Sequence, residues 1–200
     1  MGLAGEGVID DAVWIVKSHF PERIGRATFN ANKCIVIVRN PLDSIFSLFN
    51  MVGTTTHSES LDKEVLDRVM QYTDLWDQFI QQEVTVWADF HTYWIKAPQK
   101  LPTHFVKYED LLENPCAALT EISKFLLNAS TLDDFSALTN IIAQITQPSQ
   151  QVNNSPYKPR SGKINANLHL YSLQQLAFIY SRCNSSLKHI ELFGYQKYFE

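Results

Sequence analysis

The stretch Lys33–Asn50, "KCIVIVRNPLDSIFSLFN", joins an apolar run to a polar turn and then to a second apolar pattern. Its first part, Cys34–Val38, is continuous and rich in β-branched residues, which is typical of a strand covered on both faces in a parallel sheet. Asn40 and Pro41 predict a helix start, because Asn caps a first turn and Pro is tolerated at its first position. Four later positions give this helix an apolar face: Leu42, Ile45, Phe46 and Phe49. The stretch therefore predicts a strand–turn–helix unit with Arg39 at the end of the strand.

Similar short apolar runs alternate with helical patterns along the chain. Val13–Val16 predicts an earlier strand, and "THFVKYEDL" predicts a third one that ends near Tyr108. This alternation indicates an α/β domain with a mainly parallel sheet. The predicted later helices are Leu61 to about Met70, a long amphipathic helix from Tyr72 to Trp94, the segment begun by Asn114-Pro115, Leu132–Ile145 capped by Thr131, Ser172–Cys183, and Leu187–Phe193 closed by Gly194.

The ends of the predicted strands carry polar chemistry. Lys17, Arg39 and Tyr108 each fall at or just beyond such an end, and ligands bind at the carboxyl ends of the strands in open α/β sheets. The planar guanidinium of Arg39 matches a phosphate, and Ser47, two helical turns later, can donate to the same anion. The alternative is that Arg39 pairs with Asp43 or caps a helix, and that Ser47 is a packed polar residue.

Composition limits the classes of protein. The 200 residues suit one domain, and the net charge of −4 argues against a general nucleic-acid or membrane-surface binder. Three cysteines without a CxxC spacing give no zinc site and no disulfide framework. Three N-x-[ST] sequons would matter only in a secretory compartment: Asn128, Asn153 and Asn184.

Four segments, in order, resemble those of sulfotransferases that use 3′-phosphoadenosine 5′-phosphosulfate (PAPS): "VKSHFP", "VRNPLDSIFS", "KYEDLLENP" and "YKPRSGKI". The sequence around the first two is most similar to the branch associated with WSC-domain sulfotransferases. The resemblance implies a P-loop NTPase-like three-layer α/β domain with a short parallel sheet flanked by helices. It also implies that Arg39 and Ser47 bind the 3′-phosphate and that Tyr108 lies against the adenine. Three further positions would bind the same phosphate: Arg160, Ser161 and Gly162.

The same resemblance implies two catalytic residues and no metal ion. His19 would take the proton from the acceptor group, and Lys17 would stabilise charge on the transferring sulfuryl group. Sulfuryl transfer, like phosphoryl transfer, depends on positioning and charge stabilisation, and an imidazole suits proton transfer near neutral pH.

One family feature is missing from this sequence. The family begins with a strand and a Gly-rich loop that holds the 5′-phosphosulfate, and "GLAGEGVIDD" has neither. We therefore expect residues 1–200 to be a partial sulfotransferase domain that lacks the first strand and the phosphate loop. Its sheet should expose apolar surface where that strand would pair, and the chain should bind 3′,5′-diphosphoadenosine weakly and transfer sulfate poorly.

The expected function is transfer of the sulfuryl group from PAPS to a hydroxyl or amine of a carbohydrate or protein-linked acceptor. The alternatives are a non-catalytic nucleotide- or partner-binding module on the same fold and a P-loop nucleotide kinase, whose Walker loop and Mg²⁺-binding acid are not visible. We expect the Golgi lumen, with membrane attachment only through an anchor in the missing N-terminal part. The cytoplasm is the alternative compartment.

Overall fold

A computed structural model describes residues 13–21, 31–56, 58–72, 74–97, 101–147 and 163–199 of the chain. Within these residues two strands, β1 (Cys34–Val38) and β2 (Thr103–Lys107), pair in parallel, with Cys34 opposite Thr103 and Val38 opposite Lys107. The two carboxyl ends therefore lie side by side at one edge of the sheet.

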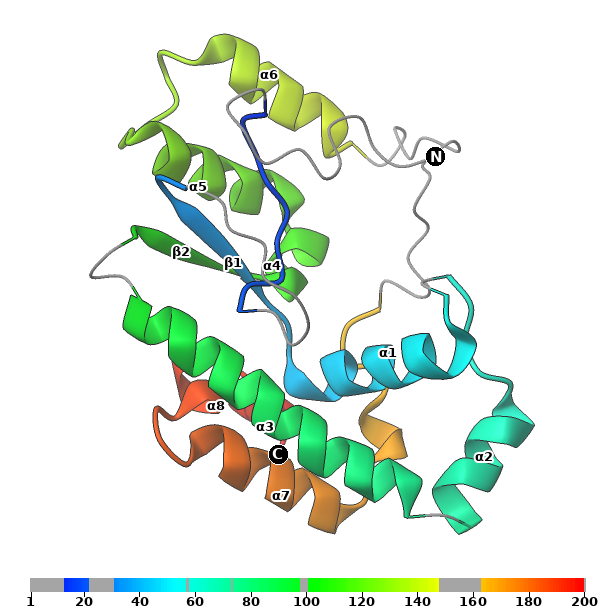
Figure 1. The fold of residues 1–200 in the computed structure, drawn as a ribbon. Helices are drawn as coiled ribbons and strands as arrows, with labels where there is room; N and C mark the ends of the chain where they lie inside the picture. Colours follow the sequence, from blue (N-terminus) through cyan, green and yellow to red (C-terminus); the bar gives the residue numbers. More distant parts are fainter. Residues whose placement is uncertain are drawn as a thin grey trace.

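Helices lie on both sides of this sheet, as Figure 1 shows. One side carries α5 (Pro115–Leu127) and α6 (Ser136–Ile145), and the other carries α3 (Leu75–Lys96), α7 (Leu173–Asn184) and α8 (His189–Leu192). The remaining elements are α1 (Pro41–Thr54), α2 (Lys63–Tyr72), α4 (Tyr108–Glu113) and two short 3₁₀ helices, η3 (Leu168–Leu170) and η4 (Gln196–Tyr198). The predicted α/β class with a short parallel sheet flanked by helices is confirmed.

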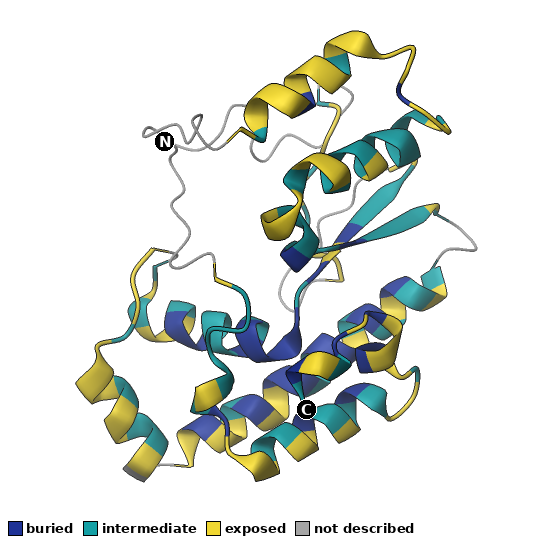
Figure 2. Cartoon of the chain, turned by 180° about the vertical axis from the view of Figure 1, so that it is seen from behind, coloured by how far each residue is buried: buried dark blue, intermediate teal, exposed yellow. Residues whose placement is uncertain are grey.

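The core lies between the sheet, α1 and the long helix α3, where Figure 2 shows most of the buried residues. Val36 and Val38 of β1 point into it, and α3 contributes buried side chains at helical spacing. Its buried positions are Trp76, Ile80, Glu83, Val84, Trp87, Ala88, His91 and Trp94. The amphipathic pattern read from the sequence is therefore the packing face of this helix.

Two helix starts follow the predicted chemistry. The Asn40 side chain accepts a hydrogen bond from the Asp43 amide at 2.9 Å, and Pro41 occupies the first helical position. Asn114 caps α5 in the same way, 3.2 Å from the Ala117 amide. Because a cap needs only residues close in sequence, both starts could be predicted from the sequence alone.

The predicted strand at Val13–Val16 is wrong. This segment has no strand pairing, and the side chains of Trp14 and Ile15 are 82% and 71% exposed. Short apolar runs become strands only where a neighbour supplies hydrogen bonds and cover, which periodicity does not report. The same limit applies to β1, whose Ile37 is 57% exposed although the continuous run predicted cover on both faces.

Another prediction is wrong at its boundary. The helix expected over Leu132–Ile145 begins only at Ser136, and Phe135 rather than Thr131 precedes it. Among the described residues, no helix combines the length and the apolar character needed to cross a bilayer. The expected missing strand beside β1 stays a prediction.

Candidate functional site

Arg39 leaves the carboxyl end of β1, and its backbone is held by two side chains. Its carbonyl oxygen accepts hydrogen bonds from Trp87 Nε1 at 3.0 Å and from Ser44 Oγ at 3.4 Å. Its guanidinium carbon lies 4.7 Å from the ring centroid of Tyr108, which follows the end of β2. The pairing of the two strands therefore brings together two of the residues that the sequence predicted at one crevice.

One N–H donor of the Arg39 guanidinium is unsatisfied in the described part of the chain. Its Nε is buried and has no hydrogen-bond partner within the described part of the chain. A buried N–H of a cation without an acceptor is costly, and an anion at the strand end would satisfy both its charge and its donor. The side chain therefore fits the phosphate group that the sequence analysis assigned to it.

A buried polar network supports the start of α1. Glu109 Oε1 accepts hydrogen bonds from the Asn40 amide at 3.0 Å and from Asn40 Nδ2 at 2.8 Å. Glu109 Oε2 accepts one from the Tyr195 hydroxyl at 2.9 Å, and Tyr195 is 1% exposed. Burial and the negative charge of Glu109 raise the pKa of Tyr195, so its hydroxyl stays a donor.

Asp43 links α1 to residues 165–167. Its Oδ2 accepts from the Asn165 amide and its Oδ1 from Asn167 Nδ2, both at 2.7 Å. Oδ2 also accepts from Asn40 Nδ2 at 3.0 Å. The described residues contain no ion pair between Asp43 and Arg39, so this alternative reading of Arg39 is not supported. The predicted Arg160, Ser161 and Gly162 lie outside the described residues.

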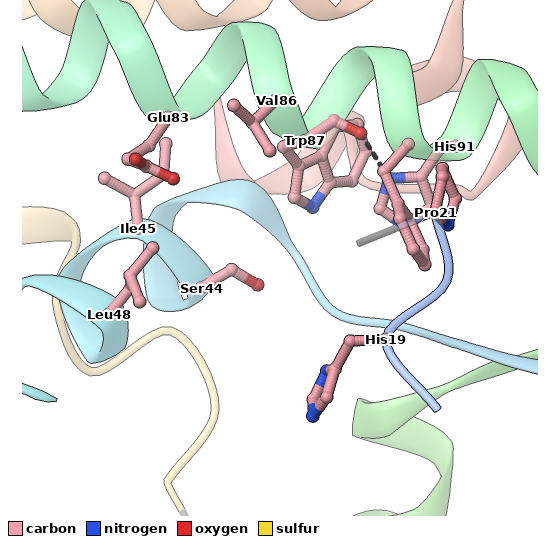
Figure 3. A pocket seen from close by; sticks show the side chains of 10 residues that line it. His19, Pro21, Ser44, Ile45, Leu48, Glu83, Val86, Trp87 and His91 are labelled. Carbon is pink, nitrogen blue, oxygen red and sulfur yellow. Dashed lines mark hydrogen bonds between the residues drawn. The ribbon is translucent and has the colours of Figure 1, made fainter. Parts of the chain in front are cut away.

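A pocket of about 580 Å³ lies between α1 and α3. In Figure 3 its lining side chains come from these two helices and from the segment that carries His19 and Pro21. Its lining residues are His19, Pro21, Ser44, Ile45, Leu48, Glu83, Val86, Trp87, Phe90 and His91. The pocket is mainly apolar with a few polar groups, which is the usual make-up of a small-molecule site.

Phe20 attaches the segment that carries His19 to α3. The Phe20 carbonyl accepts a hydrogen bond from Trp94 Nε1 at 2.9 Å, and its ring lies 5.7 Å from the ring of Tyr93. His19 and Lys17 are both exposed, but only His19 is among the described lining residues of the pocket. Lys17 was expected at a strand end beside Arg39, and no strand places it there.

Ser47 lies two turns along α1 and is half-buried. Its position relative to a bound anion is not established by any contact described above, so its assigned role stays a prediction. Trp87 of α3 is both buried and part of the pocket wall.

His91 is a pocket residue that the sequence analysis missed. It is 4% exposed, and its Nδ1 lies 2.6 Å from the Trp87 carbonyl oxygen. Burial lowers the pKa of His91 to about 4, and His189 lowers it further, against the effect of the hydrogen bond to Trp87. The available signal was helical spacing, since His91 follows Trp87 by four residues and Glu83 by eight, on one face of α3.

The described residues contain no group of three or more His, Cys, Asp or Glu side chains placed to hold a metal ion.

The sequence model of the family described as "Sulfotransferase domain" matches residues 11–167. The chain is also similar to Sulfotransferase 6B1 of Gorilla gorilla gorilla, at 31% identity over 111 residues, which are 54% of this chain and 34% of that protein. Its fold is similar to the crystal structure of mouse sulfotransferase SULT7A1 complexed with PAP, with a TM-score of 0.56 and 18% identity over 82% of this chain and 63% of that one. The match thus spans about a third of the length of this curated relative.

Proposed function

We propose that this chain, which belongs to the sulfotransferase domain family, carries the 3′-phosphate half and the acceptor side of a PAPS-dependent sulfotransferase site. The activity would move a sulfuryl group from PAPS to a hydroxyl or amine. The observation that carries the proposal is the pair at the strand ends: the Arg39 guanidinium, with its buried unpartnered Nε, 4.7 Å from the Tyr108 ring.

In this proposal Arg39 donates hydrogen bonds to the 3′-phosphate, and Ser47 adds a hydroxyl donor. Tyr108 packs against the adenine with the side of its ring that Arg39 leaves open. Arg160, Ser161 and Gly162 would complete the phosphate contacts. Support comes from Asp43, which ties α1 to Asn165, three residues beyond Gly162 in the sequence.

PAPS supplies the activated sulfuryl group, and the protein supplies the proton acceptor and the charge. His19, at the pocket rim, would remove the proton of the attacking hydroxyl or amine. Lys17, two residues earlier on an exposed segment, would approach the sulfuryl group as a stabilising cation.

The acceptor would occupy the pocket between α1 and α3. The flat apolar side chains of Trp87 and Phe90 suit the C–H face of a sugar, and Glu83 and His91 suit its hydroxyls. The proposed acceptor is therefore a carbohydrate or a protein-linked group. A Golgi lumen location and membership of the WSC-domain branch belong to the same proposal, and the sequons and the "VKSHFP" segment support them.

The nucleotide half of the proposal is tested by calorimetric titration with 3′,5′-diphosphoadenosine and with adenosine 5′-phosphate, which lacks the 3′-phosphate. The unchanged chain should prefer the first nucleotide, and Arg39→Ala should weaken its binding by about 10- to 100-fold, the range for a hydrogen bond to a charged group. Exposed Arg68 on α2 provides the control, because Arg68→Ala removes the same charge away from the site. Equal affinities for the two nucleotides, or an unchanged affinity in Arg39→Ala, would contradict the phosphate assignment.

An enzyme and a non-catalytic binding module are distinguished by substitution of His19, because only an enzyme has a turnover that depends on this residue. In an extended chain that carries a phosphate loop, His19→Ala should lower turnover by about 100-fold or more and leave the nucleotide affinity unchanged. A binding module would show no turnover to lose in either protein.

A further inference from the structure

Two side chains on the α3 wall of the pocket, Glu83 and His91, can accept hydrogen bonds. Glu83 and His91 lie two turns apart on α3, and the lining residues described above include no lysine or arginine. The carboxylate of Glu83 is an acceptor only, and it has capacity for several donors. This wall therefore differs in kind from the strand-end region, where Arg39 provides donors.

The protonation state of His91 follows from its surroundings. A carbonyl oxygen accepts hydrogen bonds but cannot donate, so the 2.6 Å contact with Trp87 places a proton on Nδ1. Burial lowers the pKa of His91 to about 4, which keeps the ring neutral at physiological pH. Nε2 then carries no proton and has a lone pair that can accept a hydrogen bond. This nitrogen is buried and has no hydrogen-bond partner in the described residues. A buried acceptor of this kind in a pocket wall lacks a donor that the ligand could bring.

We propose that His91 is a specificity-determining residue that accepts a hydrogen bond through Nε2 from a second hydroxyl or N–H of the sulfate acceptor. The inference rests on the proposed function, since it assigns the pocket beside His19 to the acceptor. Glu83 on the same wall repels anions, so the pocket selects uncharged or cationic acceptors with a donor beside the reacting group. The acceptor class is thus a polyol-like or amino-alcohol-like molecule with an apolar face, and acceptors already carrying a carboxylate or sulfate are disfavoured.

The ring nitrogens of the unchanged protein provide the direct test. A ¹⁵N-labelled chain is titrated with methyl β-galactopyranoside, methyl β-galactopyranosiduronate, catechol and phenol, and the His91 nitrogens are followed by long-range ¹H–¹⁵N correlation. Before addition, Nδ1 should be protonated and Nε2 should have the shift of a free lone pair. Catechol and the neutral galactoside should move the Nε2 resonance toward the protonated range without changing Nδ1. Phenol and the uronate should leave it in place, with at least about fivefold weaker binding, the size of one hydrogen bond.

Two variants separate the hydrogen bond from packing. In His91→Asn the amide N can keep the bond to the Trp87 carbonyl, but nothing occupies the position of Nε2. In His91→Gln an amide reaches toward that position. We expect His91→Asn to bind catechol and phenol equally and His91→Gln to keep part of the preference.

Failure of this inference can be distinguished from failure of the proposed function, which the nucleotide titration tests. An unmoved Nε2 resonance with all four probes, a protonated Nε2 in the free protein, or an unchanged preference in a folded His91→Asn would overturn the inference. Each could occur while 3′,5′-diphosphoadenosine still binds through Arg39, and the proposed function would then stand. Loss of the nucleotide's 3′-phosphate dependence would instead remove the proposed function.

Discussion

The two sides of the candidate site are built differently. On the proposed nucleotide side, Asn40, Asp43 and Glu109 are at most 4% exposed, and their hydrogen bonds reach segments far apart in the sequence. On the acceptor side, His19 sits on an exposed segment that Phe20 attaches to α3. If the proposed roles hold, the anion-binding position is part of the folded core, whereas the proton acceptor His19 lies on a segment that should contribute little to the free energy of unfolding.

The largest expected effect comes from removing Glu109. In Glu109→Ala the Asn40 amide loses its acceptor inside the core, and Asn40 Nδ2 and the Tyr195 hydroxyl each lose one of two acceptors, keeping Asp43 and the Val38 carbonyl. The free energy of unfolding should fall by more than about 3 kcal/mol in urea denaturation, because each unsatisfied buried group costs about 1–3 kcal/mol.

The neighbouring residue is the matched control for that prediction. Asp110 is 49% exposed at its side chain and pairs with Lys107 at 3.3 Å. Asp110→Ala should change the free energy of unfolding by less than about 1 kcal/mol, as for other surface ion pairs. Equal costs for the two variants would remove the contrast between a buried network and an ordinary surface.

The next effect is a pH dependence that originates in the pocket wall. The unfolded chain binds a proton at an imidazole with a pKa of about 6.5, whereas burial lowers the pKa of folded His91 to about 4. Between these values the unfolded state binds more protons, so the free energy of unfolding should fall as the pH is lowered through this window, by at most about 3 kcal/mol. Urea denaturation at several pH values, compared with His91→Gln, isolates this contribution. Parallel curves for the two proteins would show that folded His91 titrates normally.

The smallest effect is expected on the acceptor side. Phe20 is 39% exposed, so Phe20→Ala should cost about 1 kcal/mol or less in the free energy of unfolding. Phe49, 7% exposed in the core, is the control of the same chemistry, and Phe49→Ala should cost about 3–5 kcal/mol. Similar losses in both variants would mean that the segment with His19 is as integral to the fold as α1.

The parts of the site that follow from local chemistry could be read from the sequence. Asn40 caps α1 through a residue three positions away, and the position of Arg39 and Tyr108 follows from two parallel strands. The strand predicted at Val13–Val16 failed because strand formation depends on a partner that a single run does not reveal.

Contacts between segments distant in the sequence could not be predicted from local sequence patterns. The partners of Glu109 and Asp43 lie on Tyr195, Asn165 and Asn167, and nothing in the local pattern singles out those residues. His91 has the spacing of a core residue, and only its hydrogen bond to Trp87 reveals the lone pair that remains.

The link between Asp43 and Asn165 has a consequence for biosynthesis. It joins residues 122 positions apart, so the emerging polypeptide can form β1 and begin α1 long before the partner of Asp43 has left the ribosome. Contacts of such sequence separation form slowly and late. The carboxylate of Asp43 therefore stays without these two partners until residues 165–167 have been synthesised, and the proposed nucleotide-binding geometry is complete only then.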